Sequence, residues 1–171
     1  MNIPSDRSTV RDVSGRFTLL TLIDVRGASL PAPPATIATF VSKVGLASTL
    51  VDTPTVVAVR PLVFRLVWIG LEPTSEDFTV FVHLRNVAIQ TIAQADGQPI
   101  GGSFPTSQWL CGDIIWDRHT LNLPTTAAPG QYYLVVGLYR HATLKRLEAQ
   151  TLAGRADSDE VKVAEVTVES H

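Results

Sequence analysis

Three segments of the chain, at 62–68, 78–84 and 132–138, place large apolar residues at every second position. Successive side chains of a β-strand point to opposite faces of a sheet, so this spacing puts each apolar set on one face. The turn signal Pro129–Gly130 precedes the third segment. The sequence therefore predicts three strands that share a core, and this pattern constrains the fold more than any other feature.

Weaker patterns predict strands at 17–24, 56–60, 87–93, 114–123 and 161–168, and a strand through Leu147 after a turn at 141–143. The short gap at Arg85–Asn86 predicts a hairpin. The valines of the last segment change phase near Ala164–Glu165, where we expect a β-bulge. Strand–helix–strand alternation does not occur, so the predicted fold class is all-β. We expect an antiparallel β-sandwich, immunoglobulin-like or jelly-roll, of about eight strands, with an irregular insertion near residues 28–50.

The composition fits one packed domain. The chain has 171 residues, of which 45% are hydrophobic and 18% charged, and a domain of this size needs no disulfide or metal for stability. We expect a flexible N-terminal segment at 1–14 and a single β-sandwich domain at 15–171. The one cysteine, Cys111, excludes an internal disulfide, and we expect it to be a small packing residue.

Charge and hydropathy exclude several function classes. The formal net charge is −2 and no block of lysines or arginines occurs, which argues against nucleic-acid binding and a polybasic membrane contact. No apolar run approaches the roughly 18 residues of a membrane-spanning helix, so we expect no direct membrane insertion. Residues 1–15 lack the apolar core of a signal peptide, which predicts a cytoplasmic protein unless an export or membrane segment belongs to it elsewhere.

Several spaced motifs occur in a recognisable order. They are the segments at 77–84 (DFTVFVHL), 96–102 (DGQPIGG), 105–109 (PTSQW), 112–117 (GDIIWD), 121–124 (LNLP), 129–139 (PGQYYLVVGLY) and 146–147 (RL). Their order resembles a β-sandwich domain at the C-terminal end of bacterial, Chloroflexi-type membrane glycosyltransferases of the mannosyltransferase-like type. The resemblance covers roughly residues 61–147 and implies an accessory, extracytoplasmic sandwich. The membrane catalytic part of that family is absent here, residues 28–50 have no counterpart, and Arg85–Asn86–Val87 replaces the usual Asp-Ala-Asp-Gly turn.

No motif predicts catalysis, a metal or a cofactor. The chain has no Gly-x-Ser-x-Gly elbow and its histidines are scattered, with His83 on an outward and His119 on an inward strand position. The acidic residues at 157–160 could offer oxygen ligands to calcium, but a solvated loop is the favoured interpretation. The glycine-rich segment at 97–102 lacks the Lys-Ser/Thr of a phosphate-binding loop and is better explained as a chain reversal with glycines at positive φ.

The tryptophans give the candidate binding site. Trp116 falls on an outward strand position together with Arg118, and Trp109 lies in a loop. With Asp96 they could form a shallow carbohydrate site, because an aromatic ring packs well on the C–H face of a sugar and polar groups fix its orientation. The alternative is that both tryptophans only pack against the sandwich.

Asp117 falls on an inward strand position, and a buried carboxylate must be hydrogen-bonded. We expect it to accept hydrogen bonds from Thr106–Ser107, which would pin the connection at 96–109 to the sheet.

The sequence thus favours a non-catalytic accessory or binding domain, with a glycan as the preferred ligand and cell-envelope glycosylation as the preferred context. The alternative is a structural or protein-interaction module. Apolar residues at outward positions, Val63, Val67, Ile69 and Phe81, predict a sheet covered on both faces, either by residues 28–50 or by another protein subunit.

Overall fold

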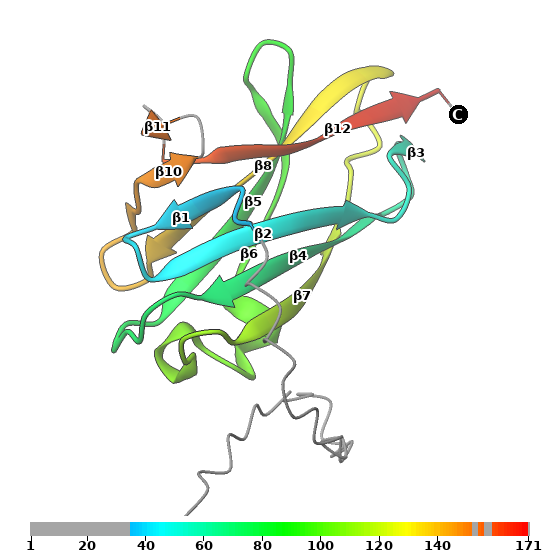
Figure 1. The fold of residues 1–171 in the computed structure, drawn as a ribbon. Helices are drawn as coiled ribbons and strands as arrows, with labels where there is room; N and C mark the ends of the chain where they lie inside the picture. Colours follow the sequence, from blue (N-terminus) through cyan, green and yellow to red (C-terminus); the bar gives the residue numbers. More distant parts are fainter. Residues whose placement is uncertain (1–34, 152–153, 156–158, 171) are drawn as a thin grey trace, which may run out of the picture.

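A computed structural model describes residues 35–151, 154–155 and 159–170. These residues form two packed β-sheets (Figure 1), which confirms the all-β fold class. Sheet A has the order β11-β10-β1-β2-β4-β7, formed by Gly154–Arg155, Ala149–Thr151, Ala38–Phe40, Val44–Val51, Leu62–Gly70 and Ile114–Leu121. Sheet B has the order β3-β12-β8-β5-β6, formed by Thr55–Val57, Val161–Glu169, Gly130–Arg140, Phe78–Asn86 and Thr91–Gly97. The short strand β9 (Lys145–Arg146) pairs with β8.

The core lies between the two sheets and is formed by the strands with the strongest alternation. From β4 it contains Leu62, Phe64, Leu66 and Trp68, and from β5 and β8 it contains Phe78, Val80, Val82, Leu84, Leu134, Val136 and Leu138. All of these side chains are buried. The three segments predicted to share a core are therefore confirmed as strands that do so.

Some outward positions are buried as well. Val67 and Ile69 on sheet A, and Phe81 and Val135 on sheet B, are buried although they lie outside the central core. The cover over Phe81 is the hairpin of β8 and β9, because the guanidinium of Arg146 lies 4.1 Å from the centre of the Phe81 ring. Residues 38–51 do not lie over sheet B, since they belong to sheet A.

The predicted insertion near residues 28–50 is wrong over the part that the structure describes. Residues 38–40 and 44–51 form β1 and β2, which pair with each other and continue sheet A. Small and polar residues mask the alternation there, and a register shift between Leu46 and Ser48 interrupts it. The predicted strand at 17–24 and the segment at 1–14 lie outside the described residues.

Other boundaries differ by a few residues. The β5–β6 hairpin turns at residues 87–90 and not at Arg85–Asn86, because β5 continues to Asn86 and β6 begins at Thr91. Asn86 shapes this turn, since its side-chain oxygen accepts a hydrogen bond from the amide of Gln90 at 2.9 Å. The predicted bulge in the last strand is present between Lys162 and Ala164. The strand expected at 56–60 is β3, and its parallel pairing with β12 makes sheet B mixed.

Two 3₁₀ turns, η1 (Pro99–Gly102) and η2 (Thr106–Gln108), lie in the connection between β6 and β7. Gly101 and Gly102 adopt φ of 61° and 84°, as expected for a chain reversal. No helix among the described residues is long and apolar enough to cross a membrane.

Candidate functional site

Trp116 lies on the outer face of sheet A, near the free edge of β7. Its side chain is 57% exposed, and its strand register sets it beside Val67 of β4. Arg118 follows two residues later on the same face, directly opposite Arg65. The period-two alternation of β7 explains this placement, because Asp117 between them points into the core.

The surface around Trp116 combines apolar and cationic side chains. Ile114 and Leu50 are exposed on the same face of the sheet. Arg65 donates a hydrogen bond to Asp52 at 3.0 Å, which neutralises its charge. Arg118 has no such carboxylate partner among the described residues. We define the Trp116 face as Trp116, Arg118, Arg65, Ile114 and Leu50. It offers an exposed aromatic ring and the N–H donors of Arg118 on the outer face of sheet A.

The other two residues of the predicted site lie elsewhere. Trp109 is only 2% exposed, and its indole N–H donates to the carbonyl of Phe104 at 3.0 Å. Asp96 lies on the outward side of β6 in sheet B, opposite Phe81. The structure therefore brings together Trp116 and Arg118, and does not bring Trp109 or Asp96 to them.

Asp117 is the centre of a buried polar network. It is 1% exposed and accepts hydrogen bonds from the Trp68 indole at 3.1 Å and from the Ile100 amide at 2.9 Å. Its Oδ2 atom also lies 2.7 Å from Nε2 of His119, whose ring stacks on Phe64. The carboxylate thus fixes the β6–β7 connection to the sheet through Ile100.

The expectation that Thr106 and Ser107 would bond to Asp117 is wrong. The Thr106 hydroxyl accepts from the amide of Phe78 at 2.8 Å and donates to the carbonyl of Glu76 at 2.7 Å. The Ser107 amide donates to Asp77 at 3.2 Å. These residues anchor the same connection to the start of β5, so the loop has two separate attachment points.

The described residues show no further element of a catalytic or metal site. Asp117 and His119 are paired, but Ser107 contacts Asp77 through its amide and does not join them in a nucleophile–base arrangement. Cys111 is exposed, so the expectation that it packs in the interior is wrong. Within the described part of the chain, no group of three or more His, Cys, Asp or Glu side chains could hold a metal ion.

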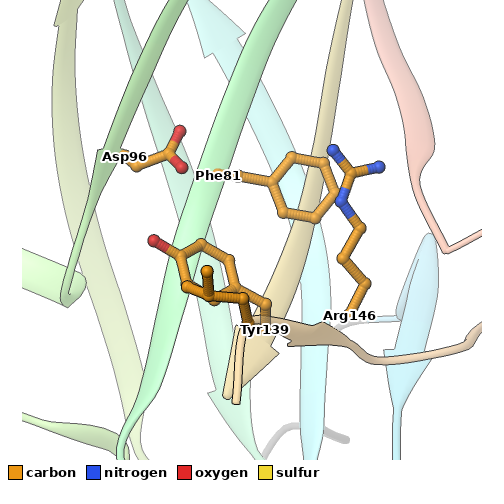
Figure 2. A pocket seen from close by; sticks show the side chains of 5 residues that line it. Phe81, Asp96, Tyr139 and Arg146 are labelled. Atoms are coloured by element: carbon orange, nitrogen blue, oxygen red, sulfur yellow. The ribbon is translucent and has the colours of Figure 1, made fainter. Parts of the chain in front are cut away.

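A small pocket of about 170 Å³ opens on the outer face of sheet B. Figure 2 shows Asp96, Tyr139 and Arg146 around Phe81, and Leu144 completes the lining. Phe81 of β5 pairs with Asp96 of β6, and Tyr139 of β8 pairs with Arg146 of β9. Two hairpins therefore assemble this pocket. Sequence analysis singled out Asp96 and the buried outward position of Phe81, but could not join them to Tyr139 or Arg146.

The floor of the pocket is rigidly built. A side chain at Gly137 would overlap the Phe81 ring, so glycine is needed for this ring to lie across β8. Arg146 lies over the ring and pairs with Asp159 at 3.2 Å and with Glu160 at 3.5 Å. Glu160 is also bound by Arg85 at 2.7 Å.

Burial favours the neutral forms of two titratable groups beside Phe81. The pKa of Tyr139 is raised because burial disfavours the phenolate, and the Asp96 carboxylate adds to this. The pKa of His83 is lowered because burial disfavours the imidazolium, and Arg146 adds repulsion. Nδ1 of His83 has no hydrogen-bond partner among the described residues.

Comparison with known proteins gives the fold. The C-terminal domain of Wzt superposes with a TM-score of 0.51 over 81% of this chain and 79% of that domain, at 7% sequence identity. The CARDB domain of a Pyrococcus furiosus protein, solved in complex with di-metal ions, gives a TM-score of 0.42 over 78% of this chain and 100% of that domain, at 10% identity. Both are β-sandwich domains. No protein-family model and no curated protein sequence matches the chain, and the link to a membrane glycosyltransferase stays a prediction.

Proposed function

We propose that this chain is a non-catalytic carbohydrate-binding domain that binds a glycan on the Trp116 face. The observation that carries the proposal is the 57% exposure of Trp116 on the outer face of sheet A. An indole ring in this position gives up the favourable burial of a large apolar surface, and a ligand that stacks on the ring restores it.

The polar neighbours suit a hydroxyl-rich ligand. Arg118 lies two residues from Trp116 on the same side of β7, and its guanidinium is free to donate hydrogen bonds. Sugar hydroxyls and ring oxygens accept such bonds while the C–H face packs on the indole. Because the face lies on the outside of the sheet and reaches its edge strand β7, it fits an extended glycan chain better than a small buried molecule.

We propose that the domain is an accessory domain in cell-envelope glycosylation. The support is the sequence resemblance over residues 61–147, which points to a sandwich appended to glycan-synthesising enzymes. In that context the domain would work outside the cytoplasm and hold a glycan near an enzyme that acts on it.

A protein-interaction module is the second candidate, and a specific observation favours it. Ile114 and Leu50 are exposed on the same face of the sheet as Trp116, and exposed apolar side chains on one face are typical of protein contacts. A protein partner would bury all three side chains, whereas a glycan would depend mainly on Trp116 and Arg118.

A glycan array probed with the full chain tests the proposal. We expect saturable binding to at least one glycan, and at least about tenfold weaker affinity for Trp116→Ala, as for the loss of a central aromatic contact. Ile89→Ala, which removes an exposed apolar side chain from the β5–β6 turn, is the matched control and should bind normally. Glycan binding that survives in Trp116→Ala would place the site elsewhere. A blank array together with self-association of the wild type would favour the protein-interaction module.

A further inference from the structure

The pocket on sheet B is separate from the Trp116 face, because it lies on the outer face of the other sheet (Figure 2). Two residues of its lining are held in place: Gly137 leaves room for the Phe81 ring, and Asp159 holds Arg146 over that ring. A site whose side chains are held in place loses little conformational entropy on binding. The pocket is therefore a candidate binding site in its own right.

The charges around the pocket leave one carboxylate without a counter-ion. Arg146 is matched by Asp159, and Arg85 by Glu160. Asp96 has no arginine or lysine ion-pair partner among the described residues, and the phenol of Tyr139 lies in the same lining (Figure 2).

The neutral state of the neighbouring groups keeps that charge uncompensated. Burial lowers the pKa of His83 and so disfavours its imidazolium form, and burial raises the pKa of Tyr139 and so disfavours its phenolate. Asp96 therefore faces the pocket as a net negative charge with oxygen atoms available to accept hydrogen bonds. A cation is the ligand group that this wall attracts most strongly.

Three other residues of the lining are apolar or aromatic. Leu144 is 71% exposed at the end of the β8–β9 turn, where its φ of 54° is unusual for a residue other than glycine. The aromatic rings of Tyr139 and Phe81 and the guanidinium of Arg146, whose charge is paired with Asp159, form the remaining surface (Figure 2). A ligand that contacts Asp96 through a cation would thus place carbon atoms against Leu144 and the aromatic rings.

The size of the pocket limits the ligand to one small group. Its volume of about 170 Å³ is below the roughly 300 Å³ at which sites for drug-sized molecules begin. One sugar ring or the end of one long side chain is the scale that fits.

We propose that this pocket binds a protonated primary amine on a compact, C–H-rich body, with Asp96 as the ammonium acceptor and Leu144 and Tyr139 as the apolar wall. Two sources share this chemistry: an amino sugar, and a lysine side chain of another protein. Because the site lies on the other sheet, the proposal does not depend on glycan binding at the Trp116 face.

Nuclear magnetic resonance titration of the ¹⁵N-labelled full chain near pH 6 tests the proposal with three probes. D-glucosamine carries the amine on a sugar, N-acetyl-lysine methylamide carries it on a side chain, and D-glucose is the neutral control. We expect at least one amine to shift the amide signals of Phe81, Asp96 and Arg146 in a saturable way, and D-glucose to leave them unchanged. A response to glucosamine alone identifies a sugar source, and a response to the lysine analogue alone identifies a protein source.

Asp96→Asn removes the charge and keeps the side-chain shape. It should weaken amine binding about tenfold or more, because hydrogen bonds to charged groups are the strong ones. Asp113→Asn is the matched control, since Asp113 is a carboxylate in the β7 turn region that bonds the Leu110 amide away from the pocket. Trp116→Ala should leave amine binding unchanged, which separates this site from the Trp116 face.

Three results would overturn the proposal: equal shifts with D-glucose, no shifts with either amine, or undiminished amine binding by Asp96→Asn.

Discussion

Replacing Asp117 by alanine should lower the free energy of unfolding by about 2–4 kcal/mol. The carboxylate accepts hydrogen bonds from the Trp68 indole at 3.1 Å and from the Ile100 amide at 2.9 Å, and both lose their acceptor in the variant. Each donor left unsatisfied costs about 1–3 kcal/mol, which sums to about 2–6 kcal/mol. Removal of a buried charge returns part of this cost, so the expected loss lies in the lower half of that range. His119 loses a partner as well, but lies near enough to the surface to find water.

Urea denaturation followed by tryptophan fluorescence measures this loss. The slope of the unfolding free energy against urea concentration should be the same in wild type and variant, which checks that the mutation does not change the compactness of the folded or unfolded state. Asp113→Ala is the control, because its carboxylate accepts a backbone hydrogen bond in an exposed turn, and should cost about 1 kcal/mol or less. In Asp117→Ala, the Ile100 amide should also exchange its hydrogen faster. A loss below about 1 kcal/mol for Asp117→Ala would refute the argument that this network holds the β6–β7 connection.

Four further substitutions test other parts of the structure. Gly137→Ala would push a methyl group into the Phe81 ring, so we expect about 1–3 kcal/mol of destabilisation in the same urea assay; a neutral effect would mean that the ring is not fixed there. His83 has a lowered pKa because of burial, so its contribution to stability is present above about pH 6.5 and is lost as the pH falls through the folded-state pKa. Wild type should therefore lose more stability on acidification than His83→Gln, and parallel pH profiles would contradict this. Trp109→Ala should cost about 3–5 kcal/mol as a buried aromatic residue, whereas Trp116→Ala should stay within about 0.5 kcal/mol of wild type; similar losses for both would show that Trp116 supports the fold.

Strand positions could be predicted from the sequence because their periodicity is local. The same alternation that set Leu66 and Trp68 inward also set Asp117 inward and Trp116 outward, and the structure agrees at each of these positions. Periodicity did not predict the strands at residues 38–51. Small and polar residues there make the two faces similar in hydrophobicity, and a register shift interrupts the alternation.

Partners across the fold could not be predicted because loops and registers decide them. The sequence indicated that Asp117 needs hydrogen-bond donors, but these are the Trp68 indole and the Ile100 amide and not Thr106 or Ser107. Trp109 lies outside any periodic segment, so nothing local indicated its burial.

The pocket on sheet B illustrates the same limit. It depends on two hairpin registers, one that sets Phe81 beside Asp96 and one that sets Tyr139 beside Arg146. A shift of one residue in either hairpin would turn these side chains to the other face. Only Phe81 indicated this site in the sequence, because it is an apolar residue at an outward position where the alternation predicts a polar one.

The indole N–H signals of the three tryptophans test the central claim most directly. Those of Trp68 and Trp109 are hydrogen-bonded in the interior, to Asp117 and to the carbonyl of Phe104, whereas Trp116 is exposed. When a glycan identified on the array is titrated into the ¹⁵N-labelled protein, we predict a saturable shift of the Trp116 signal alone. Saturable binding that leaves the Trp116 signal in place would contradict a glycan site on this face.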